Sequence, residues 1–155
     1  YGGNGTPSAV ALSASGNTYS YGLSAWWMPE DSGIIPSVSA GWGLTDIPDS
    51  DIAGIESATS QSWYVGLEWS DVFVEGNSLG MAVGQPTFIS DLDTKKGYDD
   101  TVAGSGYAWE FFYKFQVTDN ITVPPAVHYL SKPYAGQDSD GLNAMSGLIK
   151  TTFKF

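Results

Sequence analysis

Residues 107–117 read YAWEFFYKFQV, and the alternation within this stretch decides the fold class. One set of alternate positions holds Tyr107, Trp109, Phe111, Tyr113, Phe115 and Val117, and the other holds Ala108, Glu110, Phe112, Lys114 and Gln116. Successive side chains of a β-strand point to opposite faces of its sheet. The stretch therefore predicts a strand with one aromatic, apolar face and one mixed face.

A period of two recurs along most of the chain, and no convincing 3.6-residue stripe indicates a helix. Turn signals rich in Gly, Asp, Asn and Pro separate the alternating runs. We expect about eight strands, at Ser8–Ala14, Thr18–Met28, Ile34–Thr45, Ser62–Trp69, Ser78–Phe88, Gly106–Val117, Ile121–Leu130 and Asn143–Phe155. The fold class is therefore all-β, and a repeated hairpin unit favours an antiparallel, up-and-down meander.

The expected connections alternate between short and long. Short turns fall at 29–33, 70–77 and 118–120, and long loops fall at 46–61, 90–105 and 131–142. In an up-and-down sheet this alternation places all long loops at one end. All of the 17 acidic residues except Glu68 and Glu110 are expected in turns and loops.

Composition excludes several classes of protein. The net charge of −11 and the absence of arginine argue against nucleic acid as a partner, because its phosphates would be repelled. The chain has no cysteine, so it can form no disulfide framework. No run approaches the 18 or so apolar residues of a transmembrane helix. No signal peptide opens the chain, so we expect an exported protein to be seen here in processed form.

Two architectures fit the alternation, a soluble sandwich or barrel and an outer-membrane barrel. The expected strands are long enough to cross the hydrocarbon, which takes about 9–11 tilted residues. Aromatic residues gather near strand ends, and the loops are asymmetric, as in outer-membrane barrels. The less apolar face holds Gly, Ser and Ala rather than the charges of a soluble surface. These features together favour the transmembrane β-barrel.

Small residues on that second face also bear on barrel size. A closed eight-stranded barrel fills its interior with side chains. Here the interior would hold mainly Gly, Ser and Ala, at Gly22, Ser37, Ser39, Gly41, Gly43, Gly66, Gly80, Ala82 and Gly84. Such an interior would be under-filled. We therefore expect the strands to be part of a wider barrel whose wall faces water.

Two stretches resemble a known family. FFYKFQVTDNITVPPAVHYLSKP with the ending GLIKTTFKF resembles the carboxyl-terminal end of cyanobacterial outer-membrane porins, in the iron-uptake branch of the OprB carbohydrate-selective porin family. WYVGLEW with GNSLGMAVGQPTF is similar to an upstream hairpin of that family. The match is dense from Ser62 to Phe155 and thinner before it.

The resemblance implies that residues 1–155 are the C-terminal portion of a barrel of about sixteen strands. The precursor would add a signal peptide, an S-layer-homology domain and a linker. The implied function is passive passage of inorganic ions, iron among them, and small solutes through a homotrimer in the outer membrane of a cyanobacterium. Phe153 and Phe155 match the terminal signal read by the barrel-assembly machinery. The family supplies no catalytic residue, so no enzyme activity is expected.

The alternation assigns the ionisable strand residues to the face that would line a lumen. These pore-lining candidates are Glu68, Glu110, Lys114, His128, Lys150 and Lys154. Charges there would bias which ions enter. The competing interpretation is that Glu110 and Lys114 only pair with neighbours and stabilise the wall. Lysines on the lipid side would cost about 2–4 kcal/mol each at the midplane, which favours placing them inward.

Two other patterns suggest chemistry that we do not expect. GNSLG at 76–80 formally matches a nucleophile elbow, but that motif requires a strand–turn–helix corner, and His128 is the only histidine. The acidic stretches DIPDSDIAGIE and DLDTKKGYDD lack the spacing of a calcium loop, so solvated loops explain them better. We expect no defined metal site and no cofactor, and weak, shared cation binding by these loops stays open.

Three functions remain open on the sequence. The first is an outer-membrane pore selective by width and lumen charge. The second is a complete eight-stranded membrane barrel that serves as an anchor or adhesion module. The third is a soluble barrel that holds a small apolar ligand against its aromatic face.

Overall fold

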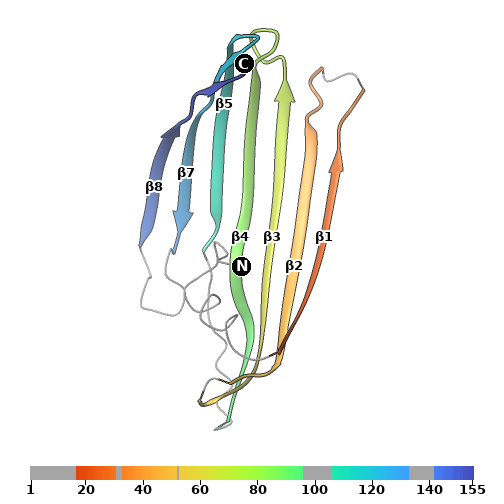
Figure 1. Ribbon diagram of the computed structural model, residues 1–155, viewed down its shortest axis with the longest axis vertical. Helices are drawn as coiled ribbons and strands as arrows, with labels where there is room; N and C mark the ends of the chain where they lie inside the picture. Colours follow the sequence, from red (N-terminus) through yellow and green to blue (C-terminus); the bar gives the residue numbers. More distant parts are fainter. Residues whose placement is uncertain (1–16, 31–32, 52, 96–105, 133–141) are drawn as a thin grey trace.

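The computed structural model describes residues 17–30, 33–51, 53–95, 106–132 and 142–155. These residues form one curled sheet, a half-barrel one layer thick, with its strands side by side (Figure 1). The strands are β1 (Asn17–Trp27), β2 (Ser37–Asp49), β3 (Ile55–Ser70), β4 (Ser78–Thr94), β5 (Ala108–Thr118), β6 (Ile121–Val123), β7 (Pro125–Ser131), β8 (Asn143–Ile149) and β9 (Thr152–Phe153). Among these residues, no helix could span a membrane. The expected all-β fold is confirmed.

Each strand pairs antiparallel with the next along the chain, as an up-and-down meander requires. One exception is where β5 pairs with both β6 and β7, and β9 returns to β6. Within the described residues the sheet does not close, because β1 pairs only with β2 and β8 only with β7. Every residue of β1 and β8 is exposed, as edge strands without an outer neighbour must be.

Several expected boundaries were wrong. The expected loop at 46–61 is largely strand, since β2 runs to Asp49 and β3 begins at Ile55. In the same way β4 continues to Thr94, well past Phe88. Five acidic residues therefore lie on strands and not in loops: Asp46, Asp49, Glu56, Asp91 and Asp93. These extensions carry a small buried cluster of Ile47, Ala58 and Ile89, and main-chain ladder hydrogen bonds pair the polar residues around it.

Two expected strands are interrupted. Pro124 separates β6 from β7, because proline cannot donate a ladder hydrogen bond. The final strand breaks at Lys150–Thr151, between β8 and β9. The first expected strand, at 8–14, lies outside the described residues.

The register defines two faces. Residues directly opposed in an antiparallel ladder point to the same side of the sheet. One row of opposed residues crosses six strands as Ser39, Gly66, Ala82, Glu110, His128 and Ser146, and we name its side the small-residue face. The adjacent row crosses as Ala40, Val65, Val83, Trp109, Tyr129 and Met145, and we name its side the aromatic face.

The sheet has almost no core of its own. Only Ile47, Ala58 and Ile89 are buried hydrophobic residues among those described, with Ile55 and Leu92 packed against them. By contrast, large apolar side chains on both edges and along the aromatic face are exposed, such as Leu23 at 72% and Phe111 at 51%. A wall of this kind needs an apolar medium on its aromatic face.

Aromatic side chains on that face carry polar tips that form hydrogen bonds at two levels of the sheet. The Trp63 Nε1 donates to Gln85 Oε1 at 2.7 Å, and Trp63 meets Tyr107 edge to face with ring centroids 6.2 Å apart. Towards the end with the β3–β4 turn, Trp69 Nε1 donates to the Ile34 carbonyl and Tyr113 Oη to the Val72 carbonyl. Two such rows, apolar in body and polar at the tip, match the girdles of a membrane barrel.

Candidate functional site

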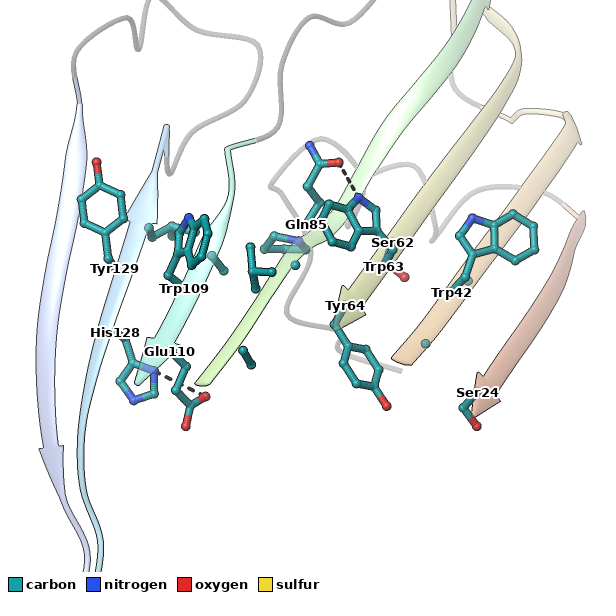
Figure 2. A pocket seen from close by; sticks show the side chains of 18 of the residues that line it. Ser24, Trp42, Ser62, Trp63, Tyr64, Gln85, Trp109, Glu110, His128 and Tyr129 are labelled. Carbon is teal, nitrogen blue, oxygen red and sulfur yellow. Dashed lines mark hydrogen bonds and ion pairs between the residues drawn. The ribbon is translucent and has the colours of Figure 1, made fainter. Parts of the chain in front are cut away.

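Glu110 and His128 form the most distinctive charged contact on the small-residue face. Glu110 on β5 lies directly opposite His128 on β7, and Glu110 Oε2 is 3.7 Å from His128 Nδ1. Figure 2 shows the two side chains pointing toward one another. The Glu110 side chain is 44% exposed and the His128 side chain 37% exposed, so both remain open to solvent. The structure therefore joins two of the six predicted pore-lining residues in one pair.

Two further candidates lie on the same face but apart from this pair. Glu68 lies two residues beyond Gly66 on β3, opposite Ser37 and Gly80. Lys114 lies four residues beyond Glu110 on β5, opposite Ser78. Both side chains are exposed. Acidic and basic groups thus occupy successive levels of one face, and they do not converge on one point.

The last two candidates lie near the break in the final strand. Lys150 falls between β8 and β9, outside any strand, so strand alternation does not fix its direction. Lys154 follows β9, and its main-chain N–H donates to the Asn120 carbonyl at 2.8 Å. Phe153 pairs with Ile121 of β6, and Phe155 is fully exposed.

Aromatic rings seated on glycines are a feature that the sequence interpretation missed. Tyr64 on β3 lies directly between Gly41 on β2 and Gly84 on β4. A Cβ built on Gly41 would overlap the Tyr64 ring, and one on Gly80 would overlap the ring of Phe112 on β5. The rings therefore lie against the neighbouring strand, where only glycine leaves room. No sequence signal could have found this, because the pairing of glycine with ring depends on the register between strands.

The small-residue face borders a hollow of about 980 Å³. Polar side chains around it include Ser24, Ser62, Tyr64, Glu110 and His128 (Figure 2). Ser146 also lines it. Its size falls within the range of about 300–1,000 Å³ that small-molecule sites occupy. The residues that line the hollow offer hydroxyl, carboxylate and imidazole groups, and they include the exposed aromatic residues Trp42, Tyr64, Trp109 and Tyr129.

Neither of the other two sequence patterns forms a site within the described residues. Ser78 of the GNSLG stretch starts β4 opposite Lys114, and its register partners do not include His128. Among the described residues, no group of three or more His, Cys, Asp and Glu side chains could hold a metal ion. Asp99 and Asp100 lie outside the described residues.

The model of one protein family matches the chain from residue 4 to residue 155, and its description is "Carbohydrate-selective porin, OprB family". The chain belongs to the OprB family. This is an outer-membrane porin family of channels and not a family of enzymes. The resemblance drawn from the sequence is therefore confirmed at the level of the family. Its finer assignment to an iron-uptake branch is not supported by the comparisons.

Two relatives of this OprB-family chain carry no functional description. An uncharacterized protein of Nostoc sp. strain PCC 7120 is 32% identical over 141 residues, 88% of this chain and 21% of its own length. An uncharacterized protein of Synechocystis sp. strain PCC 6803 is 28% identical over 129 residues, 79% of this chain and 23% of its own. The chain thus spans about a fifth of these relatives. No solved structure matches it.

Proposed function

We propose that this chain forms part of the wall of a water-filled outer-membrane pore through which small solutes diffuse passively. The observation that carries the proposal is the division of one single-layered sheet into two faces. Glycine, serine and alanine surround Glu110 and His128 on one face, and apolar and aromatic residues cover the other. The small-residue face would border water, and the aromatic face would contact lipid.

We further propose that other strands complete the barrel, to about sixteen. The unpaired outer edges of β1 and β8 within the described residues support this, since a membrane barrel must satisfy its edge groups. The relatives are several times longer than the chain and leave room for such strands. Assembly as a homotrimer, and recognition of Phe153 and Phe155 by the barrel-assembly machinery, remain predictions.

Carbohydrates are the first class of solute to test, because the family description names them. Inorganic ions, iron among them, are the second class. Their passage is favoured by exposed charges on the small-residue face at Glu68, Glu110 and Lys114. Lys150 and Lys154 are the remaining predicted pore-lining lysines. In this proposal pore width and lumen charge set selectivity, and no chemical step takes place.

Conductance of the full-length protein in a planar lipid bilayer tests the proposal. We expect stepwise channels whose conductance rises with salt concentration. Swelling of proteoliposomes in isotonic sugar would show whether neutral solutes also pass. A membrane that stays silent after verified insertion would contradict the pore and favour the anchor or adhesion module. A protein that stays dispersed without detergent would instead favour the soluble ligand-binding barrel.

A further inference from the structure

The connections β1–β2 and β3–β4 lie at the same end of the sheet and expose large apolar side chains (Figure 1). Ile34 in the first connection and Phe73 in the second are each 91% exposed. The residues that follow them, Ile35 and Val74, are exposed as well. We name these four residues the turn patch. Single exposed apolar residues are ordinary, but a group of them on two turns indicates an interaction surface.

Hydrogen bonds hold both turns against the aromatic face. Trp69 Nε1 donates to the Ile34 carbonyl at 3.0 Å, and the Tyr113 hydroxyl donates to the Val72 carbonyl at 2.7 Å. Trp69 and Tyr113 lie in one row of the aromatic face across β3, β4 and β5. The Phe73 ring also contacts the Tyr113 ring, with ring centroids 6.1 Å apart. The turn patch is therefore continuous with the aromatic face.

The same two hydrogen bonds prepare the turns for an apolar medium. A main-chain carbonyl without a partner is costly inside a bilayer, and turns are normally confined to water for that reason. Here the carbonyls of Ile34 and Val72 each accept a bond from an aromatic side chain. Tryptophan and tyrosine are also the residues that favour the boundary between hydrocarbon and headgroups. The turn patch thus lies at the depth of an aromatic girdle.

The backbone at Phe73 is a further sign of an external partner. Its φ angle of 63° lies in the left-handed region, which is unfavourable for a bulky side chain. Strained positions of this kind gather at binding sites. Packing within the chain compensates little of this strain, because the Phe73 side chain is almost fully exposed. Burial of the ring against a partner outside the chain would compensate more of it.

We propose that the turn patch inserts among the phospholipids of the inner leaflet of the outer membrane. The inference rests on the proposed function, because it requires the aromatic face to contact lipid. Short turns of membrane barrels lie on the periplasmic side, which assigns the patch to the inner leaflet. Neither turn carries a lysine, and Glu30, Asp71 and Glu75 flank the patch. Zwitterionic headgroups therefore suit it better than anionic ones.

A protein partner, such as a second copy of the chain, is the competing occupant of the turn patch. Two features favour lipid. The patch continues the aromatic face through the contact between Phe73 and Tyr113. The polar tips of Trp69 and Tyr113 bond to the turns themselves and leave an apolar surface outward. A surface that is apolar and adjacent to the lipid-facing wall matches the edge of a leaflet.

The first test uses the full-length protein in phosphatidylcholine vesicles, with an environment-sensitive fluorophore on a single cysteine. Residues 1–155 contain no cysteine, and any cysteine elsewhere in the protein is first replaced by serine. We expect the fluorophore at Phe73→Cys to be quenched by nitroxide-labelled lipid and protected from iodide. Glu75→Cys is the matched control in the same turn and should show the reverse. Val83→Cys, on the aromatic face, reports contact between the wall and lipid.

The outcomes separate the turn patch from the proposed pore. Equal quenching by lipid at Phe73→Cys and Glu75→Cys would overturn the inference. If lipid still quenches the fluorophore at Val83→Cys, the lipid-facing wall is retained. Lack of lipid quenching at both Phe73→Cys and Val83→Cys would instead contradict the proposed orientation of the faces. Protection of Phe73→Cys from both quenchers would assign the patch to a protein contact and would also overturn the inference.

Stability in vesicles gives a second, independent test. Ile34→Ser should lower the ratio of folded to unfolded protein about tenfold, equivalent to about 1.4 kcal/mol, because the side chain no longer enters lipid. Loss of this side chain removes little packing within the chain, since Ile34 is almost fully exposed. Ile34→Val should retain most of the stability, and Glu30→Ser is the control in the same turn. Urea unfolding measures all three variants, and an unchanged midpoint in Ile34→Ser would overturn the inference.

Discussion

Glycine determines where aromatic rings can rest on the small-residue face. Gly80 on β4 is buried beneath the ring of Phe112, its register partner on β5. Gly22 on β1 has open space around the position of a Cβ. The two glycines occupy the same face and the same kind of extended backbone. They differ in what a methyl group would meet, so they form a natural pair for comparison.

Gly80→Ala should therefore destabilise the protein by about 1–3 kcal/mol, because the Phe112 ring must leave its place. Gly22→Ala should change stability by less than about 0.5 kcal/mol. Urea unfolding of the full-length protein in lipid vesicles, followed by tryptophan fluorescence, measures both. Equal unfolding midpoints for the two variants would show that the Phe112 ring is not seated on Gly80.

Glu110 is the predicted lumen charge with the clearest surroundings. If the small-residue face lines the proposed pore, Glu110→Gln should shift ion selectivity toward anions, because the variant removes one negative charge from that face. The reversal potential in a salt gradient measures this shift. Glu75→Gln makes the same change in the β3–β4 turn, away from the small-residue face, and should leave the reversal potential closer to that of the wild type. Equal shifts would contradict a special role for Glu110.

At the scale of an element, the β3–β4 connection is an ordered turn fixed by Asn77. This buried side chain donates to Tyr113 Oη at 3.0 Å and accepts from the Gln116 N–H at 2.8 Å. Its own N–H donates to the Val74 carbonyl. Asp71 and Phe73 adopt positive φ angles of 58° and 63° within this turn, a conformation unfavourable for such residues. The bonds of Asn77 help to hold the turn in that strained conformation.

Asn77→Ala should cost about 1–3 kcal/mol, since it leaves the Gln116 N–H and the Tyr113 hydroxyl with fewer partners in a part-buried place. Asn143→Ala is the control, because Asn143 is exposed and accepts one bond from Tyr129. Unfolding midpoints of the two variants should differ clearly, with Asn77→Ala the less stable. Faster cleavage of the β3–β4 turn by protease in Asn77→Ala would show that the loss of stability arises at this turn. Identical midpoints would contradict the role given to Asn77.

Strand identity could be predicted from the sequence, but strand extent could not. YAWEFFYKFQV shows its period directly, and β5 occupies nearly the expected residues. The segment from Glu56 to Gln61 has Ala58 as its one apolar residue, so it carries too little alternation to detect. It pairs nonetheless with β2 and β4, whose backbones supply the hydrogen bonds. Three register shifts between β3 and β4 further obscure any regular pattern.

At the scale of the whole molecule, the described residues place most of their large apolar side chains on one face of a single-layered sheet. Adjacent residues on β4 show this division, because Ala82 lies on the small-residue face and Val83 on the aromatic face. If the aromatic face contacts lipid, a charged side chain should be tolerated at position 82 and should destabilise the protein at position 83. The pair therefore tests the orientation of the whole sheet.

Val83→Lys should destabilise the folded barrel by about 2–4 kcal/mol, the cost of lysine near the bilayer midplane. Ala82→Lys should fold and instead shift selectivity toward anions. The folded fraction after refolding into lipid vesicles, read from the shift in gel mobility on heating, compares the two. A more severe defect in Ala82→Lys would reverse the assignment of the faces.

The candidate site was predictable only in part, because alternation gives the face of a residue but not its partner on the next strand. Alternation assigned Glu110 and His128 to one face, but only the register showed that they lie opposite each other. The place of Tyr64 depends on which residues of β2 and β4 oppose it, which no local pattern reveals. For Lys150 the alternation itself was misleading. The break between β8 and β9 leaves this residue outside any strand, so alternation does not assign its side chain to a face.

The short ladder between β6 and β9 has a consequence for the order of events during assembly. Only Ile121–Phe153 and Thr122–Thr152 pair there, assisted by two bonds between Asn120 and Lys154. A contact this small can open while the longer ladders remain closed, so its amides should exchange hydrogen early. Phe153 and Phe155 would then become accessible to another protein each time this ladder opens, while the longer ladders of the sheet stay intact. We expect β9 to pair last when the sheet forms and to separate first when it opens.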